Sequence, residues 1–176
     1  PTGGETGCTS TLDNQVTPGW CTGGRYQNAD PRNTGAINTA TDIVIDGTNM
    51  YVLNSGNGGV INRYNVNTGA FIETLPNLNF DWNNPQQFTF DGSHFYVAAD
   101  ERILKVDTTG LIVSWMGKVA NNAGMSGNPG CNSLSPNDNT PGWCLGGTHK
   151  PGLDEEAFIN TWGIVDDGTN LLATSR

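Results

Sequence analysis

The sequence predicts an all-β protein, and three observations support this fold class. Glycine and proline, at 24 and 9 of the 176 residues, interrupt the chain too often for long helices. No stretch of a dozen residues places apolar side chains at the i, i+3, i+4 and i+7 spacing of an amphipathic helix. Short runs of β-branched and aromatic residues alternate instead with Gly, Asn and Asp, which is the pattern of strands joined by tight turns.

An Asp-Gly turn recurs three times along the chain. The phrase DGTN occupies positions 46–49 and 167–170, and the variant DGSH occupies 91–94. Glycine accepts a positive φ without steric penalty, so Asp-Gly between two apolar runs predicts a β-hairpin. Each copy has such runs, with DIVI, QFTF and WGIV before the turns and MYVL, FYVA and LLAT after them.

The first two turns each belong to a unit of four predicted strands. A second shared turn, Thr-Gly at 68–69 and at 109–110, joins the later strands of each unit. Asp46 and Asp91 lie 45 positions apart, and four antiparallel strands at this period are typical of a β-propeller blade. The expected strands are 41–45, 50–53, 60–65 and 70–74 in the first unit, and 87–90, 95–98, 102–106 and 111–116 in the second.

The repeat predicts an uneven domain organisation. We expect an insert at 1–35, a first blade at 36–77, a second blade at 78–118, a second insert at 119–157 and the first half of a third blade at 158–176. Propeller rings close with about four to eight blades. About two and a half blades therefore predict a segment of a longer chain, or a protomer whose sheets are completed by other protomers.

Both inserts carry the pentapeptide TPGWC, at 17–21 and at 140–144, with another cysteine thirteen positions before its own. This spacing does not match the short Cys-x2–4-Cys pairs of structural zinc sites, and the sequence has no Cys-x-x-Cys redox motif. We therefore expect disulfides Cys8–Cys21 and Cys131–Cys144, each contributing about 3 kcal/mol in the chain-entropy model. Paired cysteines and a low lysine content favour an extracellular, cell-surface or periplasmic protein.

The segment MYVLNSGNGGVINRY, at 50–64, resembles the repeat of NHL-repeat β-propellers, which usually begins Tyr-Val-Ala-Asp-Ser-Gly-Asn. Leu53 and Asn54 replace the usual Ala-Asp, and Arg63 stands at the basic position. The second blade keeps Tyr-Val-Ala at 96–98 and a basic residue at Lys105, without the Ser-Gly-Asn turn. The inserts resemble those between blades of bacterial surface-associated NHL-repeat proteins. The resemblance implies a fold, whereas propellers host enzymes, receptors and scaffolds alike.

The net charge of the chain disfavours two classes of binding partner. With 8 basic and 17 acidic residues the formal net charge is −9, which opposes binding to nucleic acid or to an anionic membrane surface. No apolar stretch approaches the roughly 20 residues that a membrane span needs. We therefore expect neither a nucleic-acid partner nor membrane insertion.

Aromatic residues are the candidate binding groups. Trp20 and Trp143 stand beside the predicted disulfides, where each ring either packs on the sulfurs as a local core or offers a stacking platform to a ligand. Tyr26 and Trp82 are expected to be exposed anchors for a protein or glycan.

Nothing in the sequence predicts catalysis. The two histidines, His94 and His149, lie in a turn and a loop, and no Gly-x-Ser-x-Gly motif is present. We expect no cofactor, with calcium on Asp13 or Asp138 as the alternative.

The sequence thus predicts a non-catalytic extracellular binding or scaffold module that presents loops for protein or glycan recognition. One alternative is a structural subunit of an extracellular filament or layer assembled by strand complementation. The other is part of a propeller hydrolase or lyase whose catalytic residues lie outside this segment.

Overall fold

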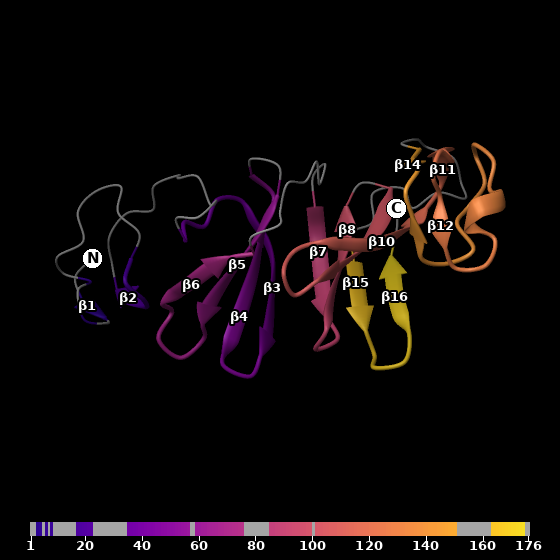
Figure 1. Ribbon diagram of the computed structural model, residues 1–176. Coiled ribbons are helices and arrows are strands. Elements are labelled where there is room, and N and C mark those ends of the chain that lie inside the picture. The colour runs from indigo at the N-terminus through magenta and orange to yellow at the C-terminus, as the bar shows by residue number, and fades with distance from the viewer. Residues whose placement is uncertain are drawn as a thin grey trace. The chain divides into compact units, whose positions relative to one another are not determined.

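The described part of the chain is mostly β-strand in antiparallel sheets, with almost no helix, which confirms the all-β prediction (Figure 1). The chain divides into two compact units, Pro1–Asp81 and Trp82–Arg176, which we call unit 1 and unit 2. The computed structural model describes residues 3–4, 6, 8, 17–22, 35–56, 59–75, 85–99, 101–150 and 163–174.

Unit 1 contains a four-stranded sheet in the order β3-β4-β5-β6. Its strands agree with the predicted ones to within a few residues at each end, because the turns that separate them are encoded locally. These strands are β3 (Ala40–Asp46), β4 (Asn49–Asn54), β5 (Val60–Asn65) and β6 (Phe71–Thr74).

Side-chain hydrogen bonds set the turn between β5 and β6. The Asn65 carboxamide oxygen accepts hydrogen bonds from the main-chain N–H groups of Asn67 and Thr68, at 2.9 and 3.0 Å. Gly69 closes the turn with φ of 71°, a conformation that other residues adopt only at a cost. This is the Thr-Gly turn expected from the repeat.

Gly35 and Ala36, which lead into β3, contact one face of the unit 1 sheet over β5 and β6. Met50, Val52 and Tyr64 form a buried cluster on this face, with Phe71 packed against it. The Tyr64 hydroxyl donates to the carbonyl of Gly35 at 3.1 Å. Burial raises the pKa of Tyr64, with a hydrogen bond from Asn62 acting against it, so the phenol stays a protonated donor.

Unit 2 contains a six-stranded sheet in the order β12-β13-β10-β9-β8-β7. Four of its strands are those expected for the second blade, and the other two come from the second insert. The bounds are β7 (Pro85–Phe90), β8 (His94–Ala99), β9 (Arg102–Asp107), β10 (Ile112–Gly117), β12 (Ser126–Gly127) and β13 (Cys144–Leu145).

The second insert is a folded excursion held to this sheet. Strand β11 (Val119–Asn121) pairs with β14 (Thr148–His149) at its base, and a 3₁₀ turn, η3 (Cys131–Ser133), lies between them. The predicted Cys131–Cys144 disulfide is present, with Cα atoms 5.7 Å apart. Through β13, the insert continues the sheet beyond its fourth strand.

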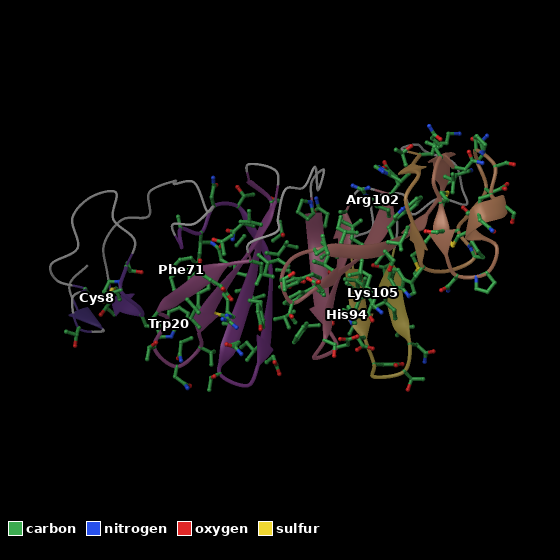
Figure 2. All side chains as sticks on the ribbon, in the orientation of Figure 1. Cys8, Trp20, Phe71, His94, Arg102 and Lys105 are labelled. Atoms are coloured by element: carbon green, nitrogen blue, oxygen red, sulfur yellow. A yellow bond between two sulfur atoms is a disulfide. The ribbon has the colours of Figure 1, made fainter. Side chains whose placement is uncertain are left out.

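The first insert repeats this local geometry within unit 1. Strand β1 (Gly3–Gly4) pairs with β2 (Cys21–Thr22), and Gly4 faces Cys21 as Gly127 faces Cys144 in the second insert. The predicted Cys8–Cys21 disulfide is present, with Cα atoms 5.6 Å apart. Cys8 and Trp20 are labelled in Figure 2.

A third hairpin, β15 (Gly163–Asp166) and β16 (Leu171–Thr174), packs on the sheet of unit 2 through contacts of β15 with β7 and β8. Ile164 joins Ala98 and Ile103 in a buried cluster between the two layers. The two strands of this hairpin were expected at these positions, whereas the propeller itself stays a prediction. Within the described residues, no helix is long and apolar enough to cross a membrane.

Candidate functional site

A cleft of about 290 Å³ opens in unit 2 where the second insert, the six-stranded sheet and the third hairpin meet. Its walls combine two aromatic rings with carboxylate, hydroxyl and amide groups. The lining residues are Asp91, Tyr96, Trp143, Asp166, Gly168, Thr169, Asn170 and Leu171.

The second insert positions Trp143 in this cleft. Cys144, the next residue, pairs with Trp115 of β10, and the indole Nε1–H of Trp115 donates to the carbonyl of Gly146 at 2.9 Å. The Trp143 carbonyl accepts a hydrogen bond from the N–H of Asn128 at 3.1 Å and lies 3.6 Å from the sulfur of Cys131. The disulfide and the sheet together fix the main chain on both sides of the indole.

The Trp143 ring lies against the sheet. Its centroid is 5.5 Å from that of Tyr96, and the Nζ atom of Lys105 is 5.6 Å from the Tyr96 centroid and 5.9 Å from the Trp143 centroid. Lys105 therefore supplies a cation–π contact to both rings. Figure 2 marks Lys105 and His94 in this part of unit 2.

Tyr96 links the aromatic side of the cleft to its acidic side. Its hydroxyl donates to Asp91 Oδ2 at 2.8 Å. Burial raises the pKa of Tyr96 to about 12, and Asp91 and Asp166 add to the shift because a tyrosinate would face their negative charges. The phenol is thus a firmly protonated donor at neutral pH.

Asp91 is held by the turn that it initiates. Its Oδ1 atom accepts hydrogen bonds from the N–H groups of Ser93 and His94, at 2.7 and 2.6 Å. Burial acts to raise the pKa of Asp91, but the hydrogen bonds from His94, Tyr96 and Ser93 outweigh it, so the pKa lies below its usual value. The carboxylate is ionised and already has its own donors.

The third hairpin supplies the opposite wall. Within the described residues, Asp166 accepts one hydrogen bond, from the N–H of Gly168 at 3.0 Å, which leaves acceptor capacity on its carboxylate. The Asn170 side-chain amide donates to Asp167 Oδ2 at 3.3 Å, so its carbonyl oxygen remains available as an acceptor. Thr169 is exposed beside them.

Asp166, which forms part of this wall of the cleft, could have been recognised from its position in the repeat. Asp166 immediately precedes the Asp-Gly turn, where the first two units have Ile45 and Phe90. A charged residue at an otherwise apolar position of a repeat marks a local change of environment. Here that environment is the cleft.

Of the four aromatic candidates, Trp20 and Trp143 belong to the part of the chain that the structure describes. Trp143 lines the cleft, whereas Trp20 lies in unit 1 and donates from Nε1–H to the carbonyl of Val66 at 2.9 Å. The Trp20 ring covers Gly69, where the Cβ of any larger residue would approach it to 2.7 Å. The Trp143 indole therefore contacts two strands, and the Trp20 indole contacts a turn. In each insert the sulfur of the first cysteine, Cys8 or Cys131, lies near the main-chain carbonyl of the tryptophan. Tyr26 and Trp82 lie outside the described residues.

The described residues include no group of three or more His, Cys, Asp or Glu side chains that could hold a metal ion. Asp138 accepts a hydrogen bond from the N–H of Ser135 at 2.8 Å, which is a turn contact, and Asp13 lies outside the described residues. The cleft itself offers aromatic ring surface and hydrogen-bond acceptors.

Comparison of the chain with protein-family models, with curated proteins and with solved structures found no match.

Proposed function

We propose that this chain is a non-catalytic binding module of a secreted or cell-surface β-propeller of the NHL-repeat type, and that its cleft binds a glycan. Two disulfides are consistent with an oxidising compartment, which supports an extracellular or periplasmic location. Two successive four-strand units followed by a third hairpin support the propeller. The rest of the ring would come from a longer chain or from other protomers.

The observation behind the glycan proposal is the pairing of aromatic rings with acceptor groups in one cleft. Trp143 and Tyr96 offer apolar ring surface, on which the C–H face of a sugar can stack. Asp166 and Asn170 have acceptor oxygens across the cleft, and sugar hydroxyls are hydrogen-bond donors. A few polar groups within a concave aromatic surface are typical of small-ligand sites.

Lys105 favours an uncharged ligand over a cationic one. A cationic peptide side chain would be drawn to the same rings by the cation–π attraction, but the ammonium of Lys105 already lies within 6 Å of both ring centroids. A second cation there would be repelled by the first. A neutral sugar avoids this repulsion and can still donate hydrogen bonds to Asp166.

The test is binding of the whole chain to an array of neutral, acidic and amino sugars, followed by calorimetry on the best ligand. We expect neutral glycans to bind, and Asn170→Ala and Asp166→Asn each to weaken binding about tenfold, since each removes or weakens hydrogen bonds to the ligand. Both side chains lie at the surface of the hairpin, so the substitutions should leave the fold intact.

Asn49→Ala is the matched control, because Asn49 holds the same place in the DGTN turn of unit 1 and does not line the cleft. This variant should bind like the wild type. Equal losses in the Asn49 and Asn170 variants, or an array on which only basic peptides bind, would refute the glycan site.

A further inference from the structure

The interface between the six-stranded sheet and the third hairpin, both in unit 2, indicates how a second interface could form. The face of the six-stranded sheet that bears Ala98 and Ile103 is covered by the face of the third hairpin that bears Ile164 and Leu171. Side chains of a strand alternate between its two faces. Each hairpin of the repeat therefore has one face that corresponds to the Ile164 face of the third hairpin, and an opposite face that corresponds to the Ala98 face of the six-stranded sheet. The interface shows which repeat positions meet when two such units stack.

The covering face is exposed on β3 of unit 1. Ile43 stands three residues before its Asp-Gly turn, as Ile164 does before Asp167. Ile164 is 8% exposed against its neighbouring sheet, whereas Ile43 and Ile45, two residues apart on one face of β3, are 53% and 60% exposed. We call these two residues the isoleucine face.

The complementary face is exposed on the third hairpin. Val165 and Leu172 are direct cross-strand partners, and they are 52% and 55% exposed. Their counterparts in the second unit are Thr89 and Tyr96, also cross-strand partners, and Tyr96 packs against the cluster formed with the third hairpin. We call Val165 and Leu172 the valine–leucine face.

We propose that the isoleucine face of one copy of this chain packs on the valine–leucine face of a second copy. One counterpart of each face, Ile164 for Ile43 and Tyr96 for Leu172, packs in the same cluster inside unit 2, which identifies a unit of the same kind as the partner. The two faces differ and lie in different units, so the contact is head-to-tail and can propagate beyond a dimer. This proposal is independent of the glycan site.

Charge makes the association weak and gives it a recognisable salt dependence. Each copy carries a formal net charge of −9, so two copies repel each other at low ionic strength. Burial of the isoleucine and valine–leucine faces is apolar and is not screened by salt. Added sodium chloride should therefore strengthen association.

Sedimentation velocity over a concentration series tests the proposal. The wild-type chain should show an average mass that rises with concentration past that of a dimer. Ile43→Lys and Leu172→Lys should each weaken self-association about tenfold or more, because each would bury an unpaired charge. An equimolar mixture of these two variants should form a dimer that grows no further, since each variant keeps one intact face.

Leu111→Lys is the control, since Leu111 is 52% exposed and lies on neither face. It should associate like the wild type, and circular dichroism should show all three variants folded. A wild-type chain that stays monomeric at every concentration overturns the proposal. So does a mixture that stays monomeric, association that weakens as salt is added, or a Leu111 variant that loses association to the same degree.

Discussion

Tyr96 joins three functions in one side chain. It packs in the cluster under the third hairpin, contacts the tilted ring of Trp143 and donates a hydrogen bond to Asp91. A phenol can do all three only while it is protonated, because a tyrosinate between Asp91 and Asp166 would be repelled by both. The protonation of this residue therefore affects both the stability of unit 2 and the cleft.

The raised pKa of Tyr96 predicts an alkaline loss of stability. The folded pKa of about 12 exceeds the ordinary value of 10.0, so the stabilisation is complete below about pH 10 and is lost as pH rises towards 12. Urea unfolding at a series of alkaline pH values, with tyrosinate absorbance recorded in parallel, measures this loss. Tyr96→Phe should be less sensitive over the same window; an unchanged pH profile in this variant would contradict the assignment.

Single residues also show where sequence reasoning reaches its limit. The identical phrase TPGWC puts Trp20 on a turn and Trp143 in a cleft. The difference lies in which distant strands each loop contacts, and no local pattern records that. Asp166 could have been found, because it breaks an apolar position of the repeat. Tyr96 could not, because the equivalent Tyr51 is also a tyrosine.

At the scale of elements, the hairpins were predictable and the inserts were not. Asp91, Asp107 and Asp167 each accept main-chain N–H bonds from the residues that follow them, so the turn is specified within a few residues. The pairing of β13 with β10 joins residues 29 positions apart, Trp115 and Cys144, and depends on the intervening loop. The disulfides could be inferred from the cysteine spacing. The addition of the insert strands β12 and β13 to the six-stranded sheet could not.

The two disulfides provide a matched test of what the second insert does. Replacing Cys131 and Cys144 by alanine should lower the free energy of unfolding by about 3 kcal/mol and also weaken glycan binding, because Trp143 loses its anchor. Replacing Cys8 and Cys21, which close a loop of the same length, should give a similar loss of stability with binding retained. Chemical denaturation and calorimetry measure the two effects. Equal glycan binding by both double variants would show that Trp143 does not contribute to the binding site.

For the whole molecule, the carboxylate-capped turns predict a response to acid. Burial acts to raise the pKa of Asp91 and Asp107, but hydrogen bonds from neighbouring N–H and O–H groups outweigh it. The pKa of Asp167 is lowered by the N–H groups of Asn170 and Thr169. All three carboxylates belong to unit 2, so acid should act on this unit through its turns.

The lowered pKa values decide in which direction stability changes with pH. Their stabilisation is present above the ordinary carboxyl pKa of 3.8 and is lost as pH falls through the lower folded values. Hydrogen exchange resolved by mass spectrometry should show protection in unit 2 falling below about pH 4. Asp107→Asn should reduce this dependence, and a variant with the wild-type profile would show that the turn carboxylates are not its source.

The short strands contributed by the second insert have a further consequence for solubility. A long β10 with open N–H and C=O groups would offer a template on which unfolded or foreign chains could add, the first step of amyloid-like aggregation. Strands β13 and β12 occupy that position with only two residues each, and Gly127 at the outermost strand has φ of 116°. On this side the six-stranded sheet therefore ends in a two-residue strand, which offers few main-chain groups with which a further strand could pair.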